Sequence, residues 1–241
     1  MIHVAIRQTM VVSVLAAASL FLSNAAFAVA SSTYSYSFVG VTNTSLDNTA
    51  SGEASLSVEV IDLGFSSEEQ TNQVAFKFTN ASSSSLTDVY FDDGTLLGIA
   101  KITDSGSTVA FTQFADPKNL PGATNLNPDF QTTVGFSLDS NAQGGVPANG
   151  VSAGEWLTVT FNLQSGQAYA NVLNALTLPN NGGTGDLRIG LHVQSFSSGS
   201  SESFVNTPDG VASPVPEAQT TAMMLAGLGL VGFMTARRRK V

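Results

Sequence analysis

The chain has 241 residues, no cysteine and a formal net charge of −9, and only 11% of its residues are charged. The absence of cysteine excludes a disulfide framework, thiol catalysis and metal sites built from cysteine. The acidic balance repels phosphate backbones, so we expect no nucleic-acid binding.

The N-terminus has the pattern of a secretory signal peptide. Arg7 supplies a positive charge, and Met10–Leu22 is an apolar segment of thirteen residues. The small residues Ala26 and Ala28 form a cleavage site of the usual A-x-A type. We expect cleavage after Ala28, with Ala30 as the alternative, and export through the general secretion machinery.

Apolar and polar residues then alternate with a period of two in many short stretches separated by turn residues. This alternation predicts strands that have one buried and one exposed face. The stretches lie at 34–41, 54–60, 74–78, 88–91, 97–102, 108–114, 131–138, 157–163 and 189–193.

One short helix is predicted after the strand at 157–163. Apolar residues recur there with helical spacing, Ser165 precedes them as a cap, and Pro179 ends the segment. Many short strands and one helix favour an all-β fold, an antiparallel β-sandwich of jelly-roll type. An immunoglobulin-like sandwich is the alternative.

The central region has the composition of a single exported domain. Residues 29–216 carry four basic and seventeen acidic side chains, a net charge of −13. We assign 29–205 to the β-sandwich ectodomain. Residues 206–216, the last part of a stretch rich in Ser, Gly and Pro, are assigned to a flexible stalk.

Few residues of the domain suggest catalysis, and we expect neither catalytic residues nor a cofactor. His192 lies on the polar face of a predicted strand, and no G-x-S-x-G elbow accompanies it. Asp92, Asp93 and Glu155 are the carboxylates considered for a glycan hydrolase. Adjacent Asp-Asp-Gly is more typical of a hairpin turn.

Two weaker binding sites are considered. Asp88, Asp92 and Asp93, with Asp186 or Glu202, offer hard oxygen ligands for calcium, although EF-hand spacing is absent. A solvated acidic loop explains the same residues. Trp156 is the only tryptophan, and it serves either as a ring that stacks on a sugar or as an anchor in the core.

The C-terminus has the composition of a membrane-sorting tail. Residues 221–236 form an uncharged, largely apolar segment, for which we predict a transmembrane helix. A basic cluster follows directly, and by the positive-inside rule it predicts that this end stays in the cytoplasm. The cluster consists of Arg237, Arg238, Arg239 and Lys240.

The tail, residues 214–241, resembles the PEP-CTERM sorting signal. Val215-Pro216-Glu217 precedes the apolar segment, and Ala218 stands where the motif usually has a second proline. The resemblance implies processing by exosortase, a transpeptidase-like membrane enzyme. It also implies an intermediate in the inner membrane and a final location at the cell surface or outside the cell.

The domain also resembles a recurring ectodomain type among PEP-CTERM proteins, which implies no known activity. The resemblance rests on stretches around 78–80, 87–94, 154–157, 187–194 and 202–206. Our hypothesis is a non-enzymatic surface or matrix protein that acts in adhesion, biofilm or floc formation. The alternatives are a carbohydrate-binding module for exopolysaccharide and a secreted glycan hydrolase.

Overall fold

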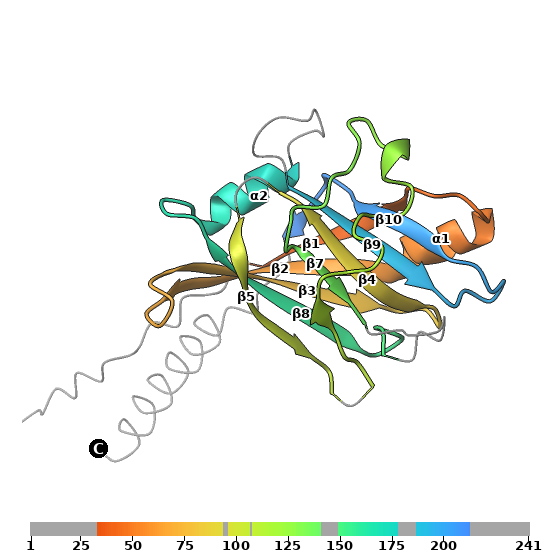
Figure 1. Ribbon diagram of the computed structural model, residues 1–241, viewed down its shortest axis with the longest axis horizontal. Helices are drawn as coiled ribbons and strands as arrows, with labels where there is room; N and C mark the ends of the chain where they lie inside the picture. The colour runs from red at the N-terminus through yellow and green to blue at the C-terminus, as the bar shows by residue number, and fades with distance from the viewer. Residues whose placement is uncertain (1–32, 94–95, 107, 141–148, 178–186, 213–241) are drawn as a thin grey trace, which may run out of the picture.

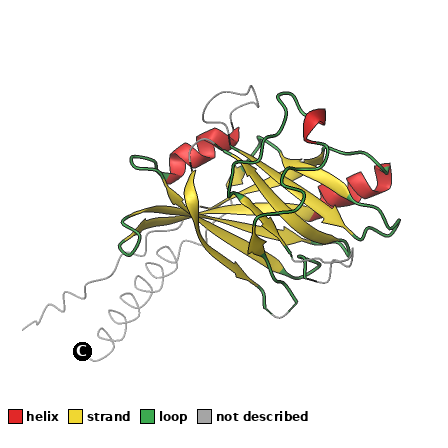
Figure 2. Cartoon of the chain, in the orientation of Figure 1, coloured by secondary structure: helices red, strands yellow, loops and turns green. Residues whose placement is uncertain are grey.

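The computed structural model describes residues 33–93, 96–106, 108–140, 149–177 and 187–212 (Figure 1). Many of these residues lie in strands of a single antiparallel sheet. The strands are β1 (Thr33–Gly40), β2 (Leu56–Ser66), β3 (Thr71–Asn80), β4 (Ser85–Asp92), β5 (Leu96–Asp104), β6 (Thr112–Gln113), β7 (Ser137–Asp139), β8 (Trp156–Leu163), β9 (Arg188–Gln194), β10 (Glu202–Asn206) and β11 (Val211–Ala212). The helices α1 (Leu46–Ser55), α2 (Tyr169–Thr177) and the 3₁₀ helix η1 (Ala123–Asn125) lie around the strands (Figure 2).

The sheet folds over at β1. The strand order is β5-β8-β3-β2-β1-β10-β9-β4-β7-β6, and β11 also pairs with β1. The first part of β1, Thr33–Ser37, pairs with β2, whereas Phe38–Gly40 pairs with β10. One layer therefore contains β5, β8, β3 and β2, and the other contains β10, β9, β4, β7 and β6. The predicted antiparallel β-sandwich is confirmed.

Aromatic rings join the two layers. The ring of Phe91 on β4 packs edge-on against Phe161 on β8 and Phe76 on β3, with centroid distances of 4.8 and 5.2 Å. Edge-to-face packing is favourable for aromatic pairs. These three side chains are completely buried. The alternating positions read from the sequence thus supply the core between the layers.

A smaller apolar cluster covers the outer face of β4, β9 and β10. The connection from Ala115 to Phe130 crosses this face and packs on Tyr90 and Val205. Gly190 permits the close approach, because a Cβ there would lie 3.0 Å from both Leu120 and Phe130. This layer of loop buries strand residues that the sequence pattern places on a polar face.

The helix prediction is confirmed for α2 but was incomplete. We expected a strand over 54–60, yet Ala54 and Ser55 end the helix α1. The buried positions of α1 are Asn48 and Gly52. A helix that buries an amide and a glycine lacks the apolar stripe by which a helix is recognised in a sequence.

Two predicted strands are mostly irregular. Of 108–114 only Thr112–Gln113 forms a strand, and of 131–138 only the last two residues do. The backbone of 131–136 is held at single points instead, as where Thr133 N donates to Phe91 O at 2.9 Å. Such isolated contacts satisfy the backbone without a continuous ladder.

Part of the predicted stalk at 206–216 belongs to the sheet. Asn206 is buried at the end of β10, and Val211–Ala212 pairs with Ser35 and Tyr34. Thr207 N also donates to Ser37 O at 2.8 Å. Residues 213–216 lie outside the described residues.

The sandwich has two distinct ends. We call the end where β1 begins at Thr33 and β11 stops at Ala212 the terminal end. The β2–β3 turn lies on this side, at the left of Figure 1. We call the opposite end, which carries α1, the β9–β10 turn and Trp156, the distal end. Helix α1 lies at the right of Figure 1.

No helix within the described part of the chain is long and apolar enough to cross a membrane. The signal peptide predicted at 1–28 and the transmembrane helix predicted at 221–236 lie outside that part.

Candidate functional site

A row of polar side chains crosses the covered face of β4, β9 and β10. In register, Asp88 faces His192, and His192 faces Ser203. Asp88 Oδ2 lies 2.9 Å from His192 Nδ1 and accepts a hydrogen bond from Thr87 Oγ1 at 2.8 Å.

This order of acid, imidazole and hydroxyl has the composition of a nucleophilic site. However, Ser203 is only 1% exposed, and its hydroxyl makes no hydrogen bond among the described residues. A substrate has no access to a hydroxyl buried in this way. The row is therefore a buried structural network, and His192 is a hydrogen-bonded strand histidine.

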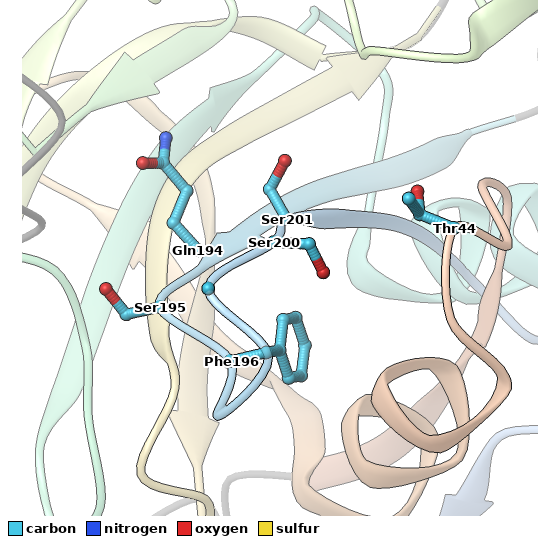
Figure 3. A pocket seen from close by; sticks show the side chains of 7 residues that line it. Thr44, Gln194, Ser195, Phe196, Ser200 and Ser201 are labelled. Atoms are coloured by element: carbon cyan, nitrogen blue, oxygen red, sulfur yellow. The ribbon is translucent and has the colours of Figure 1, made fainter.

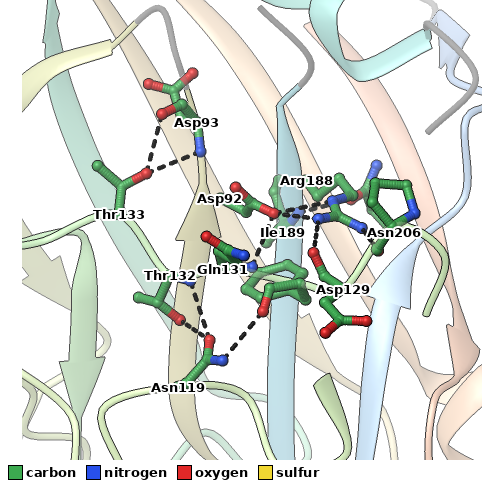
Figure 4. A network of polar contacts seen from close by, with 12 residues as sticks. Asp92, Asp93, Asn119, Asp129, Gln131, Thr132, Thr133, Arg188, Ile189 and Asn206 are labelled. Atoms are coloured by element: carbon green, nitrogen blue, oxygen red, sulfur yellow. Dashed lines mark hydrogen bonds and ion pairs between the residues drawn. The ribbon is translucent and has the colours of Figure 1, made fainter. Parts of the chain in front are cut away.

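A second network is centred on Arg188 at the start of β9 (Figure 4). Its guanidinium forms an ion pair with Asp92 and donates to the carbonyl oxygens of Pro128 and Asp129 at 2.7 and 2.6 Å. The same group lies 5.2 Å from the centroid of the Phe130 ring. Arg188 is 6% exposed, so this cation clamps the 128–130 segment onto the sheet.

A third network, which the sequence did not indicate as structural, surrounds Glu202. Its carboxylate accepts hydrogen bonds from Thr42 Oγ1 at 2.7 Å and from the backbone N–H of Ser45 at 2.8 Å and Thr44 at 3.2 Å. Glu202 is 1% exposed. It holds the connection between β1 and α1, a role that depends on residues about 160 positions away and has no local signal.

The calcium candidates take part in different contacts. Asp88 pairs with His192, Asp92 pairs with Arg188, and the backbone N–H of Asp93 donates to Thr133 Oγ1. Within the described ranges, no three His, Asp or Glu side chains lie close enough together to hold a metal ion. Asp186 lies outside those ranges.

Glu155 lies far from Asp92 and Asp93, the other two carboxylates considered for hydrolysis. Val151, four residues before Glu155, bridges to Leu86 near the start of β4. Asp92 ends β4 six residues after Leu86, about 20 Å along the strand. Glycosidase carboxylates stand roughly 5–10 Å apart. The structure therefore does not bring Glu155 together with Asp92 or Asp93.

Trp156 lines an open hollow of about 530 Å³ at the distal end. The same hollow is also lined by Ser57, Lys77, Thr79 and Glu155. The hydroxyls of Ser57 and Thr79 bond to each other at 2.7 Å, and Glu155 accepts a hydrogen bond from Thr108. Trp156 is half-buried, which places one part of the indole against the protein and leaves another part accessible.

A second open hollow, of about 520 Å³, lies where the β9–β10 turn faces the β1–α1 connection (Figure 3). Thr44 comes from one side, and Gln194, Phe196 and Ser200 come from the other. The alternation in the sequence predicts the strands but not this meeting of distant segments, so the hollow was missed.

Two buried tyrosines have altered acidities. Burial, with a smaller effect of Tyr34, raises the pKa of Tyr36 from 10.0 to about 12. Burial, reinforced by the carboxylates of Asp88, Asp139 and Asp116, raises the pKa of Tyr90 well above its usual range. Both phenols therefore stay neutral at physiological pH.

The remaining predicted sites are the cleavage residues Ala26 and Ala28, the motif Val215-Pro216-Glu217-Ala218 and the basic cluster 237–240. All of them lie outside the described residues. Their assignment depends on the sequence and on comparison with known proteins.

Residues 214–240 match the family model of the PEP-CTERM protein-sorting motif. This match covers the tail and leaves the folded domain unassigned. The motif supports an exported protein that an exosortase-type membrane enzyme sorts toward the cell surface. No curated protein and no solved structure matches the chain.

Proposed function

We propose that this chain is a cell-surface or extracellular-matrix protein without catalytic activity, which an exosortase-type enzyme cuts near Pro216-Glu217. The sorting motif at 214–240 carries the proposal. The folded domain then acts in adhesion or in biofilm and floc formation. A net charge of −13 over residues 29–216 keeps such a released domain soluble.

The polar networks of the domain support a role without catalysis. Asp88, His192, Arg188 and Glu202 are all nearly buried and bonded to neighbouring segments. Their side chains stabilise the sandwich and have little access to a substrate.

Intact mass spectrometry of protein from membrane and culture fractions tests the sorting step. We expect a species that begins near Val29 and ends near Pro216, with extra mass if a glycan or anchor is attached. If every recovered species still contains Arg237–Lys240, the proposed cleavage is contradicted.

Binding of exopolysaccharide is the second candidate function, and the hollow beside Trp156 favours it. The hollow combines an indole ring with hydroxyl, ammonium and carboxylate groups, which suit the apolar faces and hydroxyls of a sugar. It also lies at the distal end, away from the point where the chain leads to the tail.

Cosedimentation with the organism's own exopolysaccharide tests this candidate. We expect Trp156→Ala to weaken binding about tenfold or more, because the stacking surface is lost. Phe114→Ala is the matched control, since Phe114 is 67% exposed but outside this hollow. Equal binding by the two variants and the parent chain would exclude a site at Trp156.

A further inference from the structure

Three large apolar side chains are exposed toward the terminal end. Leu63, Phe65 and Leu97 are 48%, 63% and 60% exposed. We call these three residues the apolar tip. Phe65 and Leu97 line the same open hollow, of about 530 Å³.

The local backbone turns these side chains outward. The β2–β3 register passes from Asp62 directly to Gly64, and the β5–β8 register passes from Leu96 directly to Gly98. Leu63 and Leu97 are thus the unpaired residues of two bulges, and bulges commonly re-aim side chains.

The first bulge is held in place by its own contacts. Gly64 has a φ of +68°, and its N–H donates to Asp62 Oδ1 at 2.9 Å. Beyond the bulge, Phe65 pairs with Asn72 and the ladder continues. The exposure of Phe65 is therefore a feature of an ordered hairpin.

The tip projects beyond Ala212, the last described residue before the tail, at the same end of the sandwich. Tyr34 pairs with Val60 on one side and with Ala212 on the other. From the level of Val60, β2 runs five residues further to Phe65, about 17 Å. The nine residue-to-residue steps from Ala212 to Thr221, where the apolar tail segment starts, span at most about 32 Å.

We propose that the apolar tip rests on the lipid bilayer while the tail is still uncut. This inference rests on the proposed function, in which the transmembrane helix predicted at 221–236 holds the chain in the membrane before cleavage. The segment from Ala212 to Thr221 is long enough to let Phe65 reach the bilayer surface and short enough to keep Phe65 near that surface. Exposed apolar side chains on an ordered element enter the boundary between headgroups and acyl chains.

The charge around the tip selects the kind of surface. Glu68 and Glu69 lie in the turn that follows Phe65. Carboxylates are repelled by anionic lipids, so the tip fits a bilayer with neutral headgroups. In this orientation the segment near Pro216-Glu217 stays close to the membrane, and Trp156 points away from it.

Tryptophan fluorescence in vesicles tests the contact. The full chain is reconstituted into phosphatidylcholine vesicles whose acyl chains carry bromine, which quenches nearby indoles. Trp156 is the only tryptophan, so a Trp156→Phe background permits one reporter at a time. In this background, Phe65→Trp places the only indole at the apolar tip, so its quenching shows whether the tip touches the lipid. Leu46→Trp is the matched control, because Leu46 is 75% exposed at the distal end.

We expect brominated lipid to reduce the Phe65→Trp emission by about half or more, since the tip reaches the upper acyl region. The emission of Leu46→Trp, and of Trp156 in the parent chain, stays unchanged. Flotation of the same vesicles on a density gradient shows independently whether the chain is held in the membrane by its tail. If the chain floats with the vesicles but the tryptophan at position 65 is quenched no more than the tryptophan at position 46, the docking inference alone is overturned. A chain that fails to float overturns the tether and the inference together.

Discussion

Single buried polar residues in this domain stabilise the fold through a few hydrogen bonds each. Glu202 fixes the β1–α1 connection, and Asp88 holds His192 in the sheet. Tyr36 is an exception, because its buried hydroxyl makes no hydrogen bond among the described residues. An unpaired buried hydroxyl costs stability and cannot ionise easily.

This exception leads to a prediction about alkaline pH. The pKa of Tyr36 is about 12 in the folded state and 10.0 ordinarily. Below pH 10 both states keep the proton, so its contribution is constant. Between these values the unfolded state ionises first, and stability falls by up to about 1.4 kcal/mol per pH unit.

Tyr36→Phe should therefore make this part of the stability curve less steep, although burial of Tyr90 and Tyr169, which raises the pKa of each, leaves part of the slope in place. Stability at pH 7 should be equal or higher. Urea unfolding at several pH values from 8 to 12 measures both effects. The same slope in the parent chain and the variant would contradict the role of Tyr36.

Gly52 gives a second prediction at this scale. Ala is intrinsically favoured over Gly in a helix by about 1 kcal/mol. However, a Cβ at Gly52 would lie 2.1 Å from the Phe204 ring. We expect Gly52→Ala to destabilise the domain by about 1–3 kcal/mol, because overpacking outweighs propensity. Thermal unfolding measures it, and Ser51→Ala on the exposed side of α1 should be neutral or stabilising.

At the scale of elements, the 115–130 connection acts as a cover over one layer. It has little regular structure and depends on Arg188 and on the apolar side chains beneath it. Loops normally lie exposed on the surface with their polar groups in water. Here the guanidinium satisfies two of the loop carbonyls.

Removal of this clamp should be costly. Arg188→Met keeps the apolar stem but leaves Asp92 and two carbonyls without their cation, and we expect a loss of about 3–5 kcal/mol. Lys77→Met is the control, because the Lys77–Glu59 pair is 3.7 Å apart and more than a third exposed. We expect it to cost less than about 1 kcal/mol in urea unfolding. Similar losses in both variants would contradict the clamp.

The elements recovered from the sequence are those with a clear period. The strands β3, β8 and β9 have apolar residues at alternate positions, and the helix α2 has them at helical spacing. The structure contains these elements where the two patterns place them. Helix α1 lacks an apolar stripe, and the 131–136 segment is irregular although its sequence alternates. Their conformation depends on Phe204, Phe91 and other residues far along the chain.

At the scale of the whole molecule, both chain ends leave the sandwich together. Thr33 begins β1 and Ala212 pairs with the next residue, Tyr34, so the first and last described residues lie at the terminal end. In the proposed membrane-tethered state, the surfaces at the distal end lie on the side away from the membrane. This arrangement suits a domain that is presented outward before it is cut.

The sorting tail itself yields the last prediction. Ala218 occupies the place of the second proline in the motif. Ala218→Pro restores the usual motif, and we expect a larger share of cleaved protein when exosortase is present. Intact mass spectrometry measures the ratio of cut to uncut chains. Gln219→Pro introduces a proline one residue later and should not raise the ratio. An equal increase in both variants would refute recognition of position 218.

By itself the sequence determined the C-terminal sorting motif and the β-rich class of the domain, and it predicted the N-terminal signal peptide. These properties are local, because a charge cluster, an apolar segment or a period of two is complete within about twenty residues. Only the tertiary structure decided which polar residues are buried, and it separated Glu155 from Asp92. It also brought Thr44 beside Ser200 and exposed Phe65 at the same end of the sandwich as Ala212. Those outcomes depend on strand register and on loop coverage, which join residues far apart in the chain.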